Sequence, residues 1–443
     1  MIIKLVFLNA RESITDAGGV VMKIGKSFSW LIIALLVICT ASAAGATATG
    51  KPIVLGCPLS TAFLYGWDAE RGIKLAVEEI NQTGGVTFNG ASHPFNVEII
   101  DTRSLEPGVP VSEALLGVEK LILEKKADFI VGGPVRSEAA MAVMDLLNKH
   151  QKVSIVTTGV LSPGYHKRIA ADYDKFKYCF RNSSEIITIG KDMIKVFNQL
   201  NSEHGLKKAF IMVQDVAHAR KAGGFIAKLL KGTGKWEVLG QEIYPTGSTD
   251  FSMGLLKARR LKAEVLFIWM DMPESAILLK QWKNMKMKCV PMGFMSAAEQ
   301  PNFWEATKGN CEYTIVDAVN GGNVPSTMTP WTMKFVDSYK KKWGLEPEGY
   351  GTSSSYMAVY QLKAAIEAAG SLNPDAVIKA LEEQDLMGVY GRMKFAKNHQ
   401  IIPADDPEKG AAGCMFQWQD GKRVQFFPKA GATGNIILPP WMK

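Results

Sequence analysis

Short apolar runs alternate along this chain with segments in which apolar residues recur at helical spacing. An apolar run bounded by glycine or polar residues predicts a buried strand, whereas a spacing of three to four residues predicts a helix with one face in a core. Ile73, Ala76, Val77 and Ile80 form one such helical face. The predicted strands span residues 53–55, 97–100, 129–131, 154–156, 209–213, 237–243, 265–269, 290–294 and 314–319.

Strands and helices alternate from residue 53 to residue 320, which predicts parallel sheets with helices on both faces. The strands are too many for one small sheet, so we expect an α/β protein with two lobes, joined by a connector at residues 178–183. After residue 320 the pattern becomes helical, and strands return near the C-terminus around a hairpin turn at Asp420-Gly421. The later helices are predicted at 330–343, 356–369 and 374–383, and the later strands at 393–396, 413–419 and 424–427.

The segment 131–140 joins a predicted strand to a predicted helix. It contains Gly132, Gly133 and Pro134, followed by Arg136 and Ser137. Glycines let the backbone approach a ligand closely, and the free N–H groups at the start of a helix attract an anion. In an open α/β sheet, small molecules bind at this carboxyl edge. The same residues also fit a plain turn with Arg136 in solvent, and their spacing leaves both interpretations open.

The overall composition is typical of a globular protein with more than one domain. The chain has 443 residues, of which 47% are hydrophobic and 21% charged. Its formal net charge is +8, but the sequence has no long basic run. This mild excess does not favour nucleic-acid binding.

The N-terminal region predicts export. Lys23 and Lys26 precede an apolar run at 30–39, and small residues follow at 41–46. A charged region, a short apolar core and small residues make a cleavable signal peptide, with cleavage expected after Ala43 or slightly later. Because the apolar run is shorter than the roughly 20 residues of a membrane-spanning helix, we expect a periplasmic protein rather than an anchored one. Met22 is the more natural start, which makes residues 1–21 an upstream extension.

The motifs of catalysis and of metal binding are absent from the sequence. The six His residues form no HExxH or Cys/His cluster, and there is no P-loop and no GxSxG elbow. The serines at 353–355 have no His nearby in sequence, and we expect them to begin the following helix. We therefore expect no enzyme, no metal and no cofactor.

Five cysteines remain after the predicted cleavage, and their spacing fits no metal site. We favour buried free thiols. A disulfide between Cys289 and Cys311 is the alternative to test first, since an exported protein meets an oxidising environment.

Three stretches carry a resemblance to a known family. They are "KPIVLGCPLS" at 51–60, "AVEEINQTGGV" at 76–86 and "TDFSMGLLKARRLKAEVLFIW" at 249–269. Together with the signal peptide, they resemble the branched-chain amino acid type of ABC-transporter substrate-binding proteins. The resemblance implies the type I periplasmic binding fold, in which two Rossmann-like lobes, joined by three crossover segments, close over a ligand in the cleft between them. The implied lobes are 51–181 with 322–388 and 182–321 with 389–443, after an upstream extension and signal peptide at 1–48.

The resemblance also implies which residues bind the ligand. The turns after the third and fourth strands hold its carboxylate, an aromatic residue at the start of the first helix covers it, and the rest of the site comes from the second lobe. In this sequence these positions are Tyr65 with its neighbour Trp67, then Val135, Arg136, Ser137, Thr157, Thr158 and Gly159, and from the second lobe Asp215, Ala219, Asp271, Phe294 and Met295.

The site departs from the family pattern at three positions. Met295 stands near where the family's amino acid binders commonly use an acidic residue for the ligand's ammonium, and Asp271 stands where an aromatic residue is frequent. Asp271 either takes over the ammonium in a charge-assisted bond or faces a ligand without one. Arg136 replaces a small hydroxyl residue and offers a carboxylate a bidentate grip.

The resemblance implies a periplasmic receptor that delivers its ligand to an ABC permease and ATPase. We expect a monomer that binds a small, hydrophobic amino acid by hinge closure. Two alternatives stay open: import of an organic or aromatic carboxylate without an amino group, and a ligand-sensing receptor domain of the same fold.

Overall fold

The computed structural model describes residues 49–106 and 108–442, which belong to one structural unit, Ala48–Lys443. The predicted upstream extension and signal peptide lie outside the described residues. No helix among the residues described has both the length and the apolar character to cross a membrane.

The first sheet consists of five parallel strands. Side chains alternate between its two faces: Leu55 and Cys57 enter one core, whereas Val54 packs against another. Both faces are therefore covered, which explains why the strands appear in the sequence as apolar runs. The strands are β1 (Ile53–Leu59), β4 (Phe95–Asp101), β5 (Phe129–Gly132), β6 (Ser154–Val156) and β7 (Cys179–Arg181).

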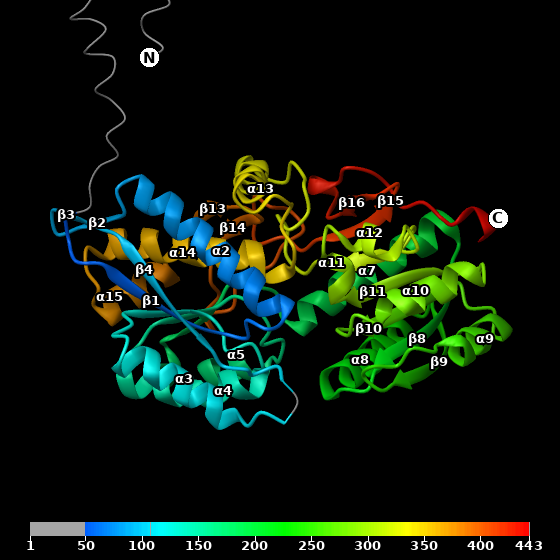
Figure 1. Cartoon of the computed structure of the whole chain (residues 1–443), viewed down its shortest axis with the longest axis horizontal. Coiled ribbons are helices and arrows are strands. Elements are labelled where there is room, and N and C mark those ends of the chain that lie inside the picture. Colours follow the sequence, from blue (N-terminus) through cyan, green and yellow to red (C-terminus); the bar gives the residue numbers. More distant parts are fainter. Residues whose placement is uncertain (1–48, 107, 443) are drawn as a thin grey trace, which may run out of the picture. The chain divides into compact units, whose positions relative to one another are not determined.

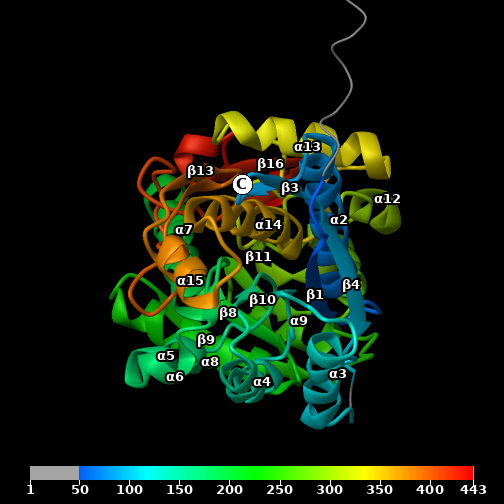
Figure 2. The same ribbon diagram turned by 90° about the vertical axis from the view of Figure 1, so that its left-hand side faces the viewer.

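The strand order is β4–β1–β5–β6–β7, and helices lie on both sides of the sheet (Figures 1 and 2). We call this sheet and the elements packed on it the first lobe. One face carries α2 (Leu64–Gln82), α13 (Pro330–Trp343), α14 (Tyr350–Ala369) and α15 (Pro374–Glu382), and the other carries α3 (Val111–Leu123), α4 (Ser137–His150), α5 (Gly164–Ala171) and α6 (Tyr173–Phe176). Two small antiparallel pairs complete it: β2 (Val86–Phe88) with β3 (Ala91–His93), and β13 (Leu386–Gly388) with β14 (Gly391–Met393).

The second sheet has seven strands in the order β16–β15–β12–β11–β10–β8–β9. Five are parallel, and two antiparallel strands from the C-terminal part of the chain form one edge. The strands are β8 (Lys208–Gln214), β9 (Glu237–Tyr244), β10 (Val265–Met270), β11 (Val290–Met295), β12 (Ile315–Asp317), β15 (Met415–Gln419) and β16 (Lys422–Phe427).

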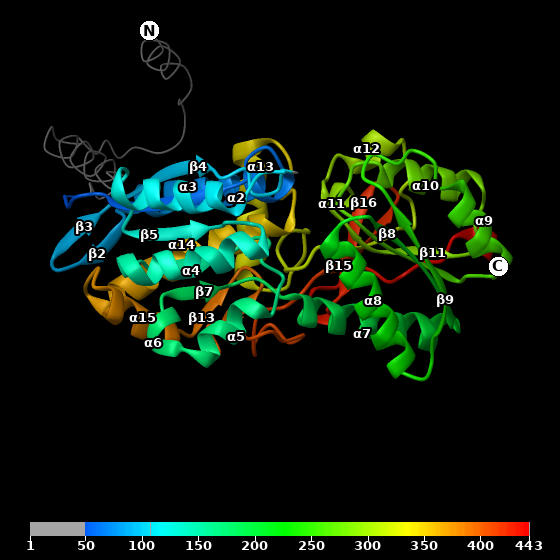
Figure 3. The ribbon, with the colours of Figure 1, turned by 90° about the horizontal axis from the view of Figure 1, so that it is seen from below.

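Helices also cover both faces of this sheet. We call the sheet and these helices the second lobe. Figure 3, seen from below, shows α8 in front of this sheet and α3 and α4 in front of the first. One face packs on α7 (Ile186–His204) and α8 (Ala217–Gly232), and the other on α9 (Ser252–Arg260), α10 (Ser275–Asn284), α11 (Ser296–Glu299) and α12 (Phe303–Thr307); short 3-10 turns lie at Lys429–Gly431 and Pro440–Met442.

The segment predicted as a connector is partly a strand. Cys179–Arg181 forms β7, the edge of the first sheet, and the chain leaves that sheet only afterwards. Arg181 is buried, and its guanidinium donates to Val160 O, Ser184 O and Ser183 Oγ. A charged residue at the end of a three-residue strand obscured the apolar pattern.

The C-terminal segment packs differently from its predicted lobe. Residues 389–412, predicted with the second lobe, contribute Val389, Tyr390 and Ile401 to the first-lobe core, and Ile401 N–H donates to Arg181 O at 2.9 Å. The predicted strand at 393–396 is likewise displaced, because β14 ends at Met393. The lobe boundaries stay a prediction, and we propose that the third crossing lies between Ala412 and Met415.

The described cysteines, Cys57, Cys179, Cys289, Cys311 and Cys414, are all buried free thiols. This confirms the favoured interpretation over the Cys289–Cys311 disulfide. Burial raises the pKa of the Cys289 thiol to about 12, so it stays protonated and unreactive.

Candidate ligand-binding site

A cavity of about 460 Å³ lies at the carboxyl ends of strands from both lobes. Its walls come from the starts of α2, α3, α4, α8 and α14, from the turns after β4, β5, β6 and β10, and from β11. Most of its walls are apolar or aromatic, and a few polar groups project from them. The lining residues are Tyr65, Leu105, Val111, Val135, Arg136, Ser137, Glu138, Gly159, Val160, Leu161, Ala217, His218, Asp271, Phe294 and Tyr350.

The first-lobe wall favours an anion. Helix α4 begins at Ser137, and the N–H groups of its first turn carry partial positive charge. Arg136, directly before it, donates from Nη2 to Val109 O at 3.2 Å. Its Nε is buried and has no hydrogen-bond partner within the described part of the chain. Arg136 also lines the cavity, where the charge of its guanidinium favours an anion.

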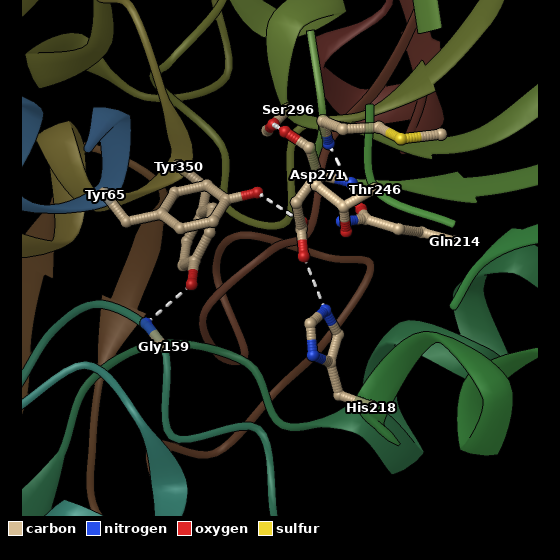
Figure 4. A network of polar contacts seen from close by, with 9 residues as sticks. Tyr65, Gly159, Gln214, His218, Thr246, Asp271, Ser296 and Tyr350 are labelled. Atoms are coloured by element: carbon tan, nitrogen blue, oxygen red, sulfur yellow. Dashed lines mark hydrogen bonds and ion pairs between the residues drawn. The ribbon is translucent and has the colours of Figure 1, made fainter. Parts of the chain in front are cut away.

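Asp271 is the centre of the polar network on the second-lobe wall (Figure 4). Tyr65, from the first lobe, donates its hydroxyl to Asp271 Oδ1 at 2.9 Å, and His218 Nε2 lies 2.5 Å from Oδ2. The backbone N–H of Asp271 donates to Gln214 Oε1 at 2.9 Å, and Ser296 Oγ donates to its carbonyl oxygen at 2.6 Å. The carboxylate is thus fixed in position and connects the two lobes.

The protonation of its two partners follows from their surroundings. Burial and the charges of Asp271 and Glu299 raise the pKa of Tyr65 well above its usual value, so the hydroxyl remains a donor. The side chain of His218 is about half exposed, and its partial desolvation by the protein would lower the pKa, but the hydrogen bond to Asp271 and the charges of Asp271 and Glu138 outweigh this effect. The pKa of His218 is therefore raised, which favours the imidazolium form.

Tyr350 forms an aromatic wall that the sequence did not indicate. Its hydroxyl accepts the N–H of Gly159 at 2.6 Å, and its ring lies 4.8 Å from that of Tyr65 and 6.1 Å from that of Phe294. The residue begins α14, more than 200 positions after the other aromatic residue of the first lobe, so no local pattern relates them. His218, in contrast, lies at the start of α8, just after β8. This is the carboxyl edge of the sheet, where ligand-binding residues are expected from sequence.

Seven of the predicted site residues line the cavity: Tyr65, Val135, Arg136, Ser137, Gly159, Asp271 and Phe294. The other six do not. Trp67 lies under the guanidinium of Arg71, Thr157 Oγ1 bonds Ser355 Oγ, Thr158 is buried, Asp215 pairs with Arg220, and Ala219 and Met295 pack in the cores of the second lobe. Binding by any of these residues stays a prediction.

Among the described residues there is no group of three His, Cys, Asp or Glu side chains that could hold a metal ion.

Residues 57–419 match the family described as Periplasmic binding protein, which spans both lobes. The chain belongs to this family. This periplasmic binding protein is 23% identical over 389 residues to Leu/Ile/Val-binding protein homolog 8 of Brucella abortus (strain 2308), covering 84% of the chain and 89% of the relative. The relative bears out the predicted resemblance to the branched-chain amino acid type.

Two solved structures show the fold of this periplasmic binding protein. The branched-chain amino acid transporter substrate binding protein LivJ of Streptococcus pneumoniae, in complex with isoleucine, is 20% identical with a TM-score of 0.68, over 88% of this chain and 100% of that one. A solute binding protein of an ABC transporter from R. palustris, in complex with benzoate, is 19% identical with a TM-score of 0.65, over 87% and 98%. The predicted two-lobed periplasmic binding fold is confirmed.

Proposed function

We propose that this periplasmic binding protein is the solute receptor of an ABC importer and binds a small amino acid with a hydrophobic side chain. Opposite charges on the two walls of the cavity support this function most directly. Arg136 and the start of α4 suit the ligand's carboxylate, and Asp271 suits its ammonium. Leu105, Leu161 and the aromatic rings of the cavity suit an apolar side chain.

The size of the cavity and its relatives agree with this ligand class. A volume of about 460 Å³ is in the range of small-molecule sites. A Leu/Ile/Val-binding protein homolog is among the sequence relatives, and an isoleucine complex is among the similar structures.

A carboxylate without an amino group is the second candidate. Each oxygen of Asp271 already accepts a hydrogen bond, from Tyr65 or His218, so an ammonium would have to displace or share one of these donors, whereas a ligand without an amino group would not. One of the similar structures is a benzoate complex.

Binding would proceed by closure of the lobes about their three crossings. The cavity takes Arg136 from one lobe and Asp271 from the other, so a ligand gains its full set of contacts only when the lobes are close. It therefore shifts the equilibrium towards the closed form by its differential affinity. A membrane complex of an ABC permease and its ATPase would then receive the ligand. We propose that the binding protein itself catalyses no reaction and is located in the periplasm.

A thermal-shift screen tests the function. Leucine, isoleucine, 4-methylvalerate and benzoate would each be added to the purified protein, with glucose as a neutral control. A ligand at about 100 times its Kd adds about 2.7 kcal/mol of stability, so the expected result is a clear shift with leucine or isoleucine and none with glucose. Small-angle scattering should then show compaction. Shifts with glucose alone would refute the charge-based site.

A further inference from the structure

His218 already occupies one side of the carboxylate that the proposed function assigns to the ligand's ammonium. It lies in the first turn of α8 with its side chain 54% exposed, and its Nε2 is 2.5 Å from Asp271 Oδ2. Since Tyr65 donates to Oδ1, the carboxylate has a donor on each oxygen. An ammonium entering the cavity has to displace or share one of these donors, and Figure 4 shows His218 reaching from its helix towards the Asp271 carboxylate.

The charges around His218 come from three elements. Asp271 follows β10, Glu138 lies in the first turn of α4 and acts on His218 through its charge, and Arg136 lines the same cavity. On α8 itself, Arg220 is paired with Asp215. When His218 is protonated, the two cations and two carboxylates of the cavity balance. When it is neutral, the cavity carries one net negative charge.

These two states suit different ligands. A protonated His218 satisfies Asp271, and the cavity then needs only a carboxylate at Arg136. A neutral His218 that keeps its remaining proton on Nδ1 leaves Asp271 Oδ2 without its donor and presents a lone pair on Nε2, so two acceptors become available to an ammonium. The proton lost from Nε2 passes to solvent, and the ligand's ammonium replaces it.

We propose, on the basis of the proposed function, that His218 is a specificity-determining residue whose proton stands in for the ligand's ammonium at Asp271. Amino acids bind the form with neutral His218 and release a proton on binding. The corresponding carboxylates without an amino group bind the form with protonated His218 and release none.

Isothermal titration with leucine and with 4-methylvalerate, which differ in the amino group, tests this proposal between about pH 5.5 and 8, the range in which a histidine titrates. The Kd of leucine should fall with rising pH, by up to about tenfold per pH unit, because one proton is released. The Kd of 4-methylvalerate should rise over the same range. The number of protons released can be measured by repeating the titration in two buffers of different ionisation enthalpy. At the acid end of the pH range, we expect about one proton released per leucine bound.

His218→Gln should abolish both pH trends, because glutamine can donate to Asp271 but cannot titrate. His204→Gln, at the end of α7 and outside the cavity, is the matched control and should retain them. Parallel trends for the two ligands, or trends that persist in His218→Gln, would overturn the inference while leaving the proposed function standing. Failure of both ligands to bind at any pH would overturn both.

Discussion

The bond between Tyr65 and Asp271 gives the sharpest test of closure, since it connects the two lobes. Tyr65→Phe removes the hydroxyl that donates to Asp271 Oδ1 at 2.9 Å. It retains the ring, whose contacts with Tyr350 at 4.8 Å and Phe294 at 6.3 Å depend only on the aromatic carbons. The variant therefore tests one polar contact rather than the packing of the cavity.

The expected loss follows from the charge of the acceptor. A hydrogen bond to a charged group contributes about 1.5–3 kcal/mol. If the bond forms only when the lobes are close, Tyr65→Phe loses its whole contribution from the closed state and none from the open state. The free energy of ligand binding then has to make up this difference, so the measured affinity falls. Each 1.4 kcal/mol is a factor of ten in Kd, so binding should weaken by about 10- to 150-fold.

Isothermal titration with the ligand identified by the thermal-shift screen measures this loss. Tyr173→Phe is the matched control: its hydroxyl also donates to a carboxylate, Glu382 at 2.6 Å, but both residues belong to the first lobe. The control should leave Kd unchanged. Equal Kd values for wild type and Tyr65→Phe, with equal compaction in solution scattering, would refute closure through this contact.

Two further predictions concern charge. Arg136→Ala should weaken binding of any carboxylate ligand by about 1.5–3 kcal/mol. Arg136→Lys should weaken it by less, because lysine keeps the positive charge but lacks the two parallel N–H donors of the guanidinium. An unchanged affinity of Arg136→Ala in isothermal titration would contradict the anion site. Burial raises the pKa of Asp317 to about 8, so the folded state holds a proton that the unfolded state, with an ordinary pKa near 3.9, has lost. Asp317 should therefore make the free energy of unfolding fall from about pH 4 to pH 8, by up to about 1.4 kcal/mol per pH unit. The buried carboxyls of Asp68 and Glu299, whose pKa values are also raised, add to the slope of the wild type. In urea unfolding, Asp317→Asn should reduce the slope by the contribution of Asp317, whereas Asp337→Asn on the surface of α13 should leave it unchanged, and equal slopes in all three proteins would refute the prediction.

The strands were predictable from sequence because burial on both faces makes them apolar. The predicted strand at 265–269 is β10 (Val265–Met270), and the predicted strand at 290–294 is β11 (Val290–Met295). Helix α13 begins and ends where the pattern placed it. The strand β7 escaped prediction because it ends in a buried charged residue, and the acceptors that satisfy Arg181 are apparent only in three dimensions.

Some of the cavity residues, like most of the strands, could be predicted from the sequence, and others could not. Arg136 lies in the turn between β5 and α4, and Asp271 directly follows β10, so both lie at the carboxyl edge of a sheet, where ligand-binding residues are expected. Tyr65 and Trp67 were predicted together, but two residues apart on a helix point about 200° away from each other, so only one of them can face the ligand. Tyr65 faces the cavity, whereas Trp67 packs against Arg71.

The shape of the cavity depends on contacts that join distant parts of the chain. Tyr350 N–H donates to the buried Glu299 at 3.0 Å, a residue of the second lobe, while the Tyr350 hydroxyl accepts from Gly159 in the first. The orientation of the aromatic wall is therefore set by both lobes together. Charged groups that bind a ligand can follow from the end of a single strand, but a wall held between two lobes requires the whole fold. This is why the charged residues of the cavity could be predicted from sequence more readily than the shape of the cavity itself.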